Sequence, residues 1–128
     1  MQLHHIGMAC GDIEEGIGHL LRVHTVVGRT PVIDDPEQDA KLVLLTLADG
    51  THIELVAGRS VESFVKRNIG LYHLCFEVTD IQAEIERLVH EGAKLIVPPR
   101  PAVLFGGRPV AFLYVGYGLI ELLQKKPG

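Results

Sequence analysis

Residues 3–21, LHHIGMACGDIEEGIGHLL, are followed later in the chain by a second version, LYHLCFEVTDIQAEIERLV, at residues 71–89. Aligned without a gap, the two stretches place His5 on His73, 68 residues later (73 − 5 = 68), and an aspartate on an aspartate. The apolar residues that follow each aspartate also coincide. The chain therefore contains two copies of one structural module.

A helix is predicted near the start of each copy. Asp12 and Asp80 are favourable N-cap residues, because their side-chain oxygens accept hydrogen bonds from the free amides of a first helical turn. Apolar residues recur at helical spacing behind both aspartates. Gly92 is positioned to end the second helix. Residues 60–68 predict a short linking helix, with Ser60 as a candidate cap.

Short apolar or alternating runs bounded by turn residues predict the strands. Each copy opens with one strand, and three more follow its helix. In the first copy the predicted strands are residues 3–9, 25–29, 41–47 and 51–57. In the second copy they are residues 71–78, 94–97, 109–115 and 118–124. Residues 31–39 and 98–107 are predicted to be loops.

The predicted fold class is α+β, with the order βαβββ, linker, βαβββ. The length of 128 residues suits one domain. We expect a single domain over residues 1–128, made of module one (1–57), a linker helix (58–69) and module two (70–128). The sequence repeat predicts that a pseudo-two-fold axis relates the modules.

Composition restricts the classes of partner. The net charge is −4 with histidine neutral, and the absence of a basic stripe disfavours a nucleic-acid partner. No apolar run approaches the ~20 residues that span a bilayer, and the start, MQLHHIG, lacks the features of a signal peptide. We therefore expect a cytoplasmic protein without a membrane partner, in which Cys10 and Cys75 are buried thiols and not a disulfide.

Two glutamates lie in the middle of apolar strands, each within the sequence Ile-Glu-Leu. Glu54 and Glu121 are 67 residues apart (121 − 54 = 67), close to the spacing of His5 and His73. Because side chains alternate along a strand, all four point to the face opposite the predicted helices. A carboxylate is costly to bury there unpaired. We therefore predict a metal site; the competing interpretation, core histidines with surface-facing glutamates, requires the repeat to retain all four by chance.

Three segments carry a resemblance to a known family: HHIGMAC near the start, DPEQDAKLVLLTLADGTHIELV in the middle and GLYHLCFEVTDIQAEIERLVHEGAKLI after it. In order and spacing they resemble the vicinal oxygen chelate superfamily of glyoxalases and bleomycin resistance proteins. Within it the chain is most similar to the methylmalonyl-CoA epimerase family. The resemblance implies two modules whose sheets curl into one open barrel around a metal, and it implies a homodimer.

The metal ligands implied by this resemblance are His5, Glu54, His73 and Glu121. Such a ligand set suits a divalent Co, Ni, Mn, Fe or Zn ion. The implied activity is that of an isomerase, which moves a proton α to a carbonyl of an acyl-CoA thioester through a metal-stabilised enolate. Glu121 is the first candidate for the catalytic base, and Glu54 is the second. Leu42 stands where some family members carry an acid, and it cannot serve as a base.

Two other enzyme classes of the same superfamily are alternatives. A glyoxalase I-like lyase uses similar proton transfer, but the sequence has no specific signature of a glutathione pocket. A non-haem Fe(II) dioxygenase uses two His and one carboxylate, and Glu54 would fill a position that O2 chemistry leaves open. A metal-free binding protein is disfavoured, because such proteins use aromatic walls and this chain has 5% aromatic residues and no Trp.

Three further polar positions have two interpretations each. Gln38 is either a loop residue near the cleft or plain surface. Residues 106–108, Gly-Gly-Arg, either turn amides and a guanidinium toward an anionic group or form an ordinary turn. His52 shares a strand face with Glu54, either as a support for that ligand or as a surface residue at a strand start.

Overall fold

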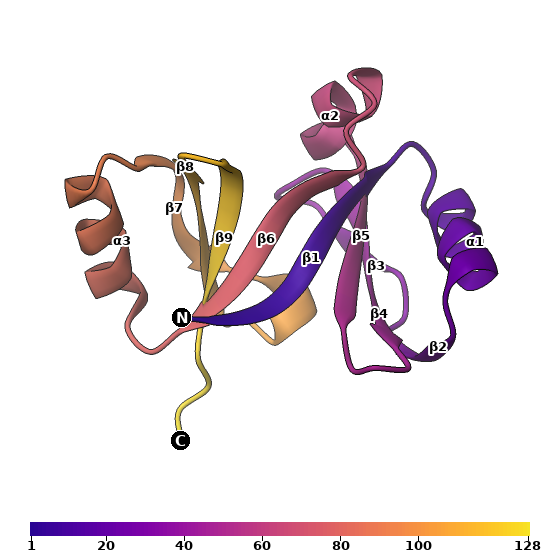
Figure 1. Cartoon of the computed structure of the whole chain (residues 1–128), viewed down its shortest axis with the longest axis horizontal. Helices are drawn as coiled ribbons and strands as arrows, with labels where there is room; N and C mark the ends of the chain where they lie inside the picture. Colours follow the sequence, from indigo (N-terminus) through magenta and orange to yellow (C-terminus); the bar gives the residue numbers. More distant parts are fainter. The chain divides into compact units, whose positions relative to one another are not determined.

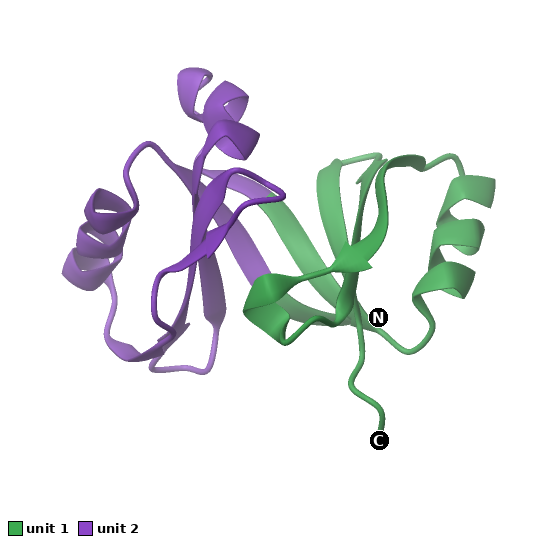
Figure 2. Cartoon of the chain, turned by 180° about the vertical axis from the view of Figure 1, so that it is seen from behind, with its two compact units in different colours: residues 1–4, 73–128 green, residues 5–72 purple.

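The structure is a computed structural model that describes all 128 residues. It divides into two compact units, shown in different colours in Figure 2. Unit 1 contains residues 1–4 and 73–128, and unit 2 contains residues 5–72. Unit 2 therefore corresponds to the first sequence copy, and most of unit 1 corresponds to the second.

Unit 2 is built on the strands of the first copy (Figure 1). Its elements are β1 (Gln2–Cys10, from residue 5 onward), α1 (Ile13–Val23), β2 (Val26–Arg29), β3 (Ile33–Asp35), β4 (Ala40–Leu47), β5 (His52–Gly58), the 3-10 turn η1 (Arg59–Val61) and α2 (Glu62–Lys66). The strand order is β2-β4-β5-β1, and β3 also pairs with β4. β1 runs parallel to β5, whereas β4 is antiparallel to β5.

Unit 1 repeats this topology with the strands of the second copy. Its elements are β6 (Leu71–Val78, from residue 73 onward), α3 (Ile81–His90), β7 (Lys94–Pro101), the 3-10 turn η2 (Val103–Phe105), β8 (Pro109–Val115) and β9 (Gly118–Gln124). The strand order is β6-β9-β8-β7. β6 is parallel to β9, and the remaining neighbours are antiparallel. The α+β class and the βαβββ order of both copies are thus confirmed.

Each long helix begins at its predicted cap and covers one face of its own strands. Asp12 accepts a hydrogen bond from the amide of Glu15 (3.2 Å), and Asp80 accepts one from the amide of Ala83 (3.1 Å). The apolar face of α1 packs on Ile53 and on other buried residues of β4 and β5, and α3 packs in the same way on β8 and β9. The strand face opposite each helix is therefore left for the histidines and glutamates.

Three local predictions were wrong. Part of the predicted loop 31–39 forms β3, which pairs with β4. β7 continues past residue 97 to Pro101, with irregular register on both sides of Val97, because prolines lack the amide needed for a regular ladder and are tolerated on this edge strand. Ser60 lies inside η1 and does not cap α2, whose N-cap position is Val61.

Two other predictions concern the helices. Gly92 follows the end of α3 with a φ of 103°, in the left-handed region that glycine adopts without strain, so the predicted stop is confirmed. No helix is long and apolar enough to cross a membrane; α1, the longest, has 11 residues.

Candidate metal centre

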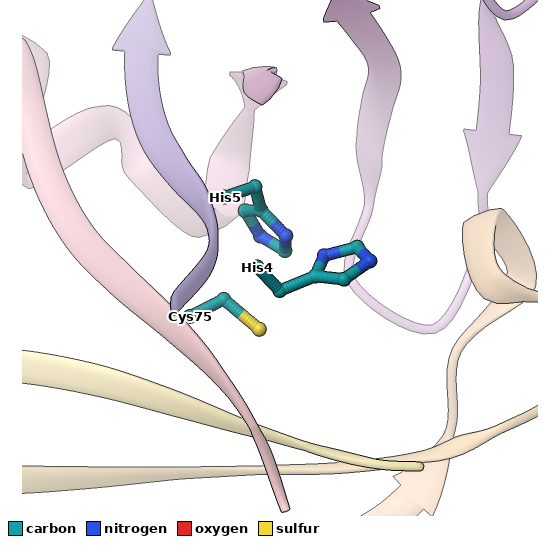
Figure 3. A group of neighbouring side chains, drawn as sticks. All are labelled: His4, His5 and Cys75. Atoms are coloured by element: carbon teal, nitrogen blue, oxygen red, sulfur yellow. The ribbon is translucent and has the colours of Figure 1, made fainter. Parts of the chain in front are cut away.

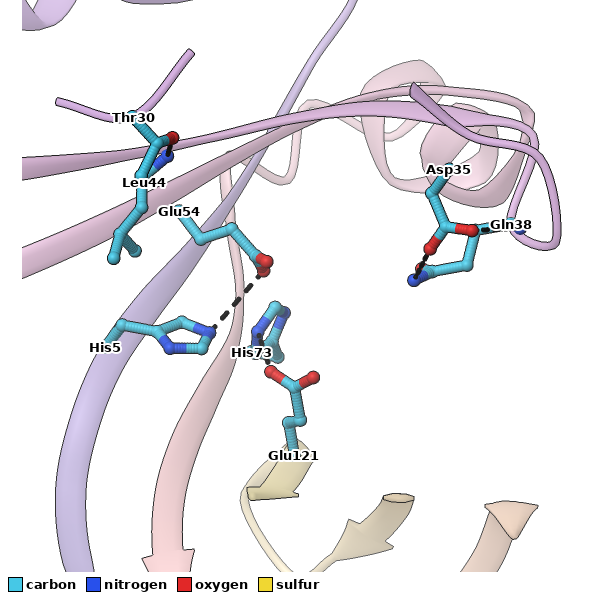
Figure 4. A network of polar contacts seen from close by, with 8 residues as sticks. All are labelled: His5, Thr30, Asp35, Gln38, Leu44, Glu54, His73 and Glu121. Carbon is cyan, nitrogen blue, oxygen red and sulfur yellow. Dashed lines mark hydrogen bonds and ion pairs between the residues drawn. The ribbon is translucent and has the colours of Figure 1, made fainter. Parts of the chain in front are cut away.

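His5 and Glu54 form a buried pair in unit 2 (Figure 4). In the parallel register of β1 and β5, Gly7 lies opposite Glu54. His5 is two residues before Gly7 and therefore points to the same face as the carboxylate. His5 Nε2 lies 3.5 Å from Glu54 Oε1, and the two residues are 1% and 5% exposed.

His73 and Glu121 form the equivalent pair in unit 1 (Figure 4). Here Cys75 lies opposite Glu121 in the parallel register of β6 and β9. His73 Nε2 lies 3.1 Å from Glu121 Oε1, and both residues are 4% exposed. The ring of Phe112, which lies opposite Glu121 on β8, packs edge-on against the His73 ring with 5.5 Å between centroids.

Burial of both glutamates decides between the two interpretations of the repeat. The alternative in which the glutamates face the surface is wrong, because each carboxylate is enclosed and lies beside an imidazole. A buried carboxylate is costly unless a cation or hydrogen bonds compensate it. Each unit thus supplies one imidazole nitrogen and one carboxylate, a donor set that fits a divalent transition-metal ion.

Phe112 is a site residue that sequence reasoning missed. Its position could have been found from the alternation along β8, since the residue directly across from Glu121 must share the face of that carboxylate. By contacting His73, Phe112 restricts the orientation of the imidazole. The equivalent residue in unit 2 is Leu44, which lies opposite Glu54 on β4.

The contacts of residues 106–108 favour the ordinary-turn interpretation of this segment. Arg108 donates hydrogen bonds to the carboxylate of Glu77 and to the backbone carbonyl of Gln124, so its guanidinium is used inside unit 1. Gly106 and Gly107 have φ values of 66° and 83°, and the amide of Gly107 donates to the carbonyl of Ala102. The segment is a tight turn that leads η2 back to β8.

The family model of the Glyoxalase/Bleomycin resistance protein/Dioxygenase superfamily matches residues 4–112 of the chain. The matched segment includes His5, Glu54 and His73 and ends before Glu121. The chain belongs to this superfamily.

Two curated proteins with similar sequences are epimerases. The chain is 29% identical over 119 residues to the ethylmalonyl-CoA/methylmalonyl-CoA epimerase of Cereibacter sphaeroides, covering 88% of this chain and 87% of the relative. It is 30% identical over 133 residues to the mitochondrial methylmalonyl-CoA epimerase of Dictyostelium discoideum, covering 97% of this chain and 78% of the relative.

The solved structures agree on the fold. The crystal structure of methylmalonyl-CoA epimerase from Mycobacterium tuberculosis superimposes with a TM-score of 0.76 at 23% sequence identity, over 98% of this chain and 89% of the other. At this identity the likeness establishes the glyoxalase fold alone. The predicted resemblance to the superfamily, and to epimerases within it, is confirmed.

The side chain of Gln38 is hydrogen-bonded within its own loop. Its side-chain amide donates to the carboxylate of Asp35 at 2.7 Å, which Figure 4 also shows. Asp35 is only 4% exposed and also accepts from the amides of Glu37 and Gln38, so it organises the loop between β3 and β4. Sequence reasoning missed this buried aspartate, because nothing in the acidic stretch distinguishes it from its exposed neighbours.

His52 is half-buried at the start of β5 and is held by a neighbour. Its Nδ1 lies 2.9 Å from the hydroxyl oxygen of Thr46, the residue directly opposite on β4. This pair lies on the Glu54 face of the strands, since residues 52 and 54 point the same way. His52 is therefore not an isolated surface residue, because it is hydrogen-bonded to Thr46 across the strands.

The two cysteines form no disulfide, as predicted, but only Cys75 is buried, because Cys10 is half-buried. Cys75 is fully buried and lies near His4 in unit 1 (Figure 3). The His4 ring packs edge-on against Phe105, with 5.3 Å between centroids. Burial raises the pKa of the Cys10 thiol to about 11, and the nearby carboxylates of Asp12 and Glu15 contribute to this rise. Cys10 is therefore a poor nucleophile.

Proposed function

We propose that the chain is an isomerase of the methylmalonyl-CoA epimerase type, acting on C2 of a 2-substituted malonyl-CoA thioester. The observation that carries this proposal is the buried His–Glu pair at equivalent strand positions in both units. The two curated relatives support the substrate class, because both are epimerases of methylmalonyl-CoA.

We propose that the two pairs together bind one divalent ion, Co, Ni, Mn, Fe or Zn, in a barrel that the two modules of the single domain form jointly. The proposed ligands are His5, Glu54, His73 and Glu121. The internal repeat supports a joint site, because an ion on a pseudo-two-fold axis would receive the same pair of donors from each module. When bound, the ion would stabilise negative charge on a carbonyl oxygen of the substrate.

In the proposed reaction, the carboxylate of Glu121 takes the proton from C2. The electron pair of the broken C–H bond is delocalised onto the thioester carbonyl, which gives an enolate. Glu54, which enters this step protonated, then gives its proton to the opposite face of C2, so the product has the same atoms with the configuration inverted and the two glutamates together hold one proton before and after the step. The two glutamates are equivalent by the repeat, which supports assigning them to opposite faces.

Deuterium exchange tests this function. Metal-depleted and Co(II)-loaded proteins are incubated with methylmalonyl-CoA in D2O, and deuterium entry at C2 is followed by mass spectrometry. We expect exchange that requires metal and is lost in Glu121→Gln, while a control change at the exposed Glu86, Glu86→Gln, leaves it intact. Stoichiometric metal binding without exchange would reject this substrate class and favour a glyoxalase-type lyase.

The proposal extends to a cytoplasmic homodimer. Cys10 and Cys75 form no disulfide with each other, which suits a reducing compartment. Apolar side chains such as Leu3 and Leu71, which are 53% and 67% exposed, supply surface that a partner copy would cover. Light scattering coupled to size-exclusion chromatography measures the mass, and a monomer at micromolar concentration would contradict the dimer.

A further inference from the structure

The two glutamates have different neighbours across the strands. On the parallel side Glu121 lies opposite Cys75, whereas Glu54 lies opposite Gly7. On the antiparallel side Glu121 lies opposite Phe112, and Glu54 lies opposite a leucine, Leu44. At both positions that flank the carboxylate, unit 2 has the smaller side chain.

The backbone fixes Leu44 beside the Glu54 carboxylate. The Leu44 amide donates to the hydroxyl of Thr30 (3.0 Å), and its carbonyl accepts from the Thr30 amide (3.0 Å). Both backbone groups of Leu44 therefore point away from β5, which makes Leu44 and Glu54 a non-hydrogen-bonded pair. In such pairs the Cα atoms are ~4.5 Å apart and the side chains lie close together. Figure 4 shows both side chains projecting to the same side.

The exposure of the two flanking residues also differs. Phe112 is 9% exposed and its ring is occupied by the contact with His73. Leu44 is half-buried, so part of its side chain remains accessible next to Glu54. An apolar, accessible surface beside one catalytic carboxylate, and a packed one beside the other, makes the reaction site asymmetric.

We infer that the C2 substituent of the acyl group lies against Leu44, on the Glu54 side, and that Leu44 sets the size of the substituent that the enzyme accepts. This inference rests on the proposed function. The substrate class is then a malonyl thioester with a short alkyl branch, because Leu44 and the glycine at position 7 supply apolar contact and space but no hydrogen-bond donor for a polar branch.

Variants at Leu44 test the inference by comparing methyl-, ethyl- and propylmalonyl-CoA in the deuterium-exchange assay. Leu44→Ala should raise the ethyl-to-methyl and propyl-to-methyl ratios of kcat/KM, and Leu44→Phe should lower them. One methylene in an apolar pocket changes kcat/KM by ~10- to 200-fold, so we expect a change of about 10-fold in each ratio. Leu44→Met, which nearly conserves volume, should leave the ratios close to wild type.

Phe112→Leu is the matched control, because it gives unit 1 the residue that unit 2 has. It should lower kcat/KM for all three thioesters by the same factor and leave the ratios unchanged. Far-UV circular dichroism and urea unfolding establish that each variant is folded; if Leu44→Phe is not, Leu44→Ala and Leu44→Val decide the question.

Two outcomes separate this inference from the proposed function. If the wild type exchanges methylmalonyl-CoA but no folded Leu44 variant changes the ratios, the inference is overturned and the proposed function stands. If the wild type exchanges none of the three thioesters, the proposed function is rejected and the inference with it.

Discussion

Units 1 and 2 keep the same His–Glu pair but surround it differently. In unit 1, Glu77 forms an ion pair with Arg108 near the end of the strand β6 that carries His73. The equivalent positions in unit 2, 68 residues earlier, are Ala9 and Ala40 (77 − 68 and 108 − 68). In unit 1 an aromatic ring also packs on the histidine of the pair, whereas the equivalent position in unit 2 holds an aliphatic, half-buried side chain.

This comparison distinguishes residues that packing alone allows to vary from residues that packing does not explain. Packing tolerates replacement of an ion pair by two alanines, and of an aromatic ring by leucine, within one repeated fold. It gives no reason to retain a buried carboxylate next to an imidazole twice, since that pair is costly to bury. The proposed joint site gives such a reason, because it would need both pairs as ligands.

The largest effect is expected from removal of a histidine. His73→Ala and His5→Ala should each lower metal affinity by more than about 100-fold, because loss of groups that merely support a ligand already costs 10- to 100-fold. Calorimetric titration with Co(II) measures the affinity, and His90→Ala, at an exposed position, is the control. If only one of the two variants loses the metal, the units do not share one ion and the joint site is wrong.

The second comparison is between the two glutamates. Glutamine can still ligate through its oxygen but cannot accept the C2 proton, so Glu121→Gln should reduce exchange by about 100- to 10,000-fold, the range of general-base catalysis. Glu54→Gln should reduce it less if Glu121 is the base. The single-turnover exchange rate at saturating metal is the measurement, and a larger loss in Glu54→Gln would reverse the assignment.

The sequence was sufficient to predict the fold class, because each copy carries a capped amphipathic helix and alternating strands that agree with one another. It also predicted that His5 and Glu54 lie on one strand face, as do His73 and Glu121, since alternation and register leave little freedom. β3 was missed because residues 33–35 are too short and acidic to show a strand pattern.

The surroundings of the pairs were harder to predict. The partner of Arg108 is Glu77, 31 residues earlier in the chain, and no local pattern links two residues across such a distance. The hydrogen bonds of the Arg108 guanidinium within unit 1 could therefore be identified only from the structure. For Phe112, alternation along β8 could have given its strand face, but its contact with His73 depends in addition on the strand order of the unit.

A smaller effect, on stability, is expected where unit 1 has charges and unit 2 has alanines. Arg108→Met leaves the half-buried Glu77 carboxylate without its cation and should lower the free energy of unfolding by about 1–3 kcal/mol. Arg87→Met breaks the exposed pair with Glu84 in the same unit and should cost less than about 1 kcal/mol. Urea denaturation measures both, and equal losses would mean that the Arg108 pair contributes no more than a surface ion pair.

The smallest difference concerns the caps of the two helices. Asp12→Ala removes the side chain that holds the amide of Glu15 and should cost about 1 kcal/mol, or about 2–4 °C in Tm. Asp80→Ala should cost less, because the side chain of Gln124 still accepts a hydrogen bond from the amide of Ile81 in the first turn of α3. The equivalent of Gln124 in unit 2 is Ala57 (124 − 67), which cannot do this. The substitutions Asp12→Asn and Asp80→Asn retain a capping oxygen and serve as controls. If Asp80→Ala lowers the Tm more than Asp12→Ala does, the hydrogen bond to Gln124 does not compensate for loss of the Asp80 cap.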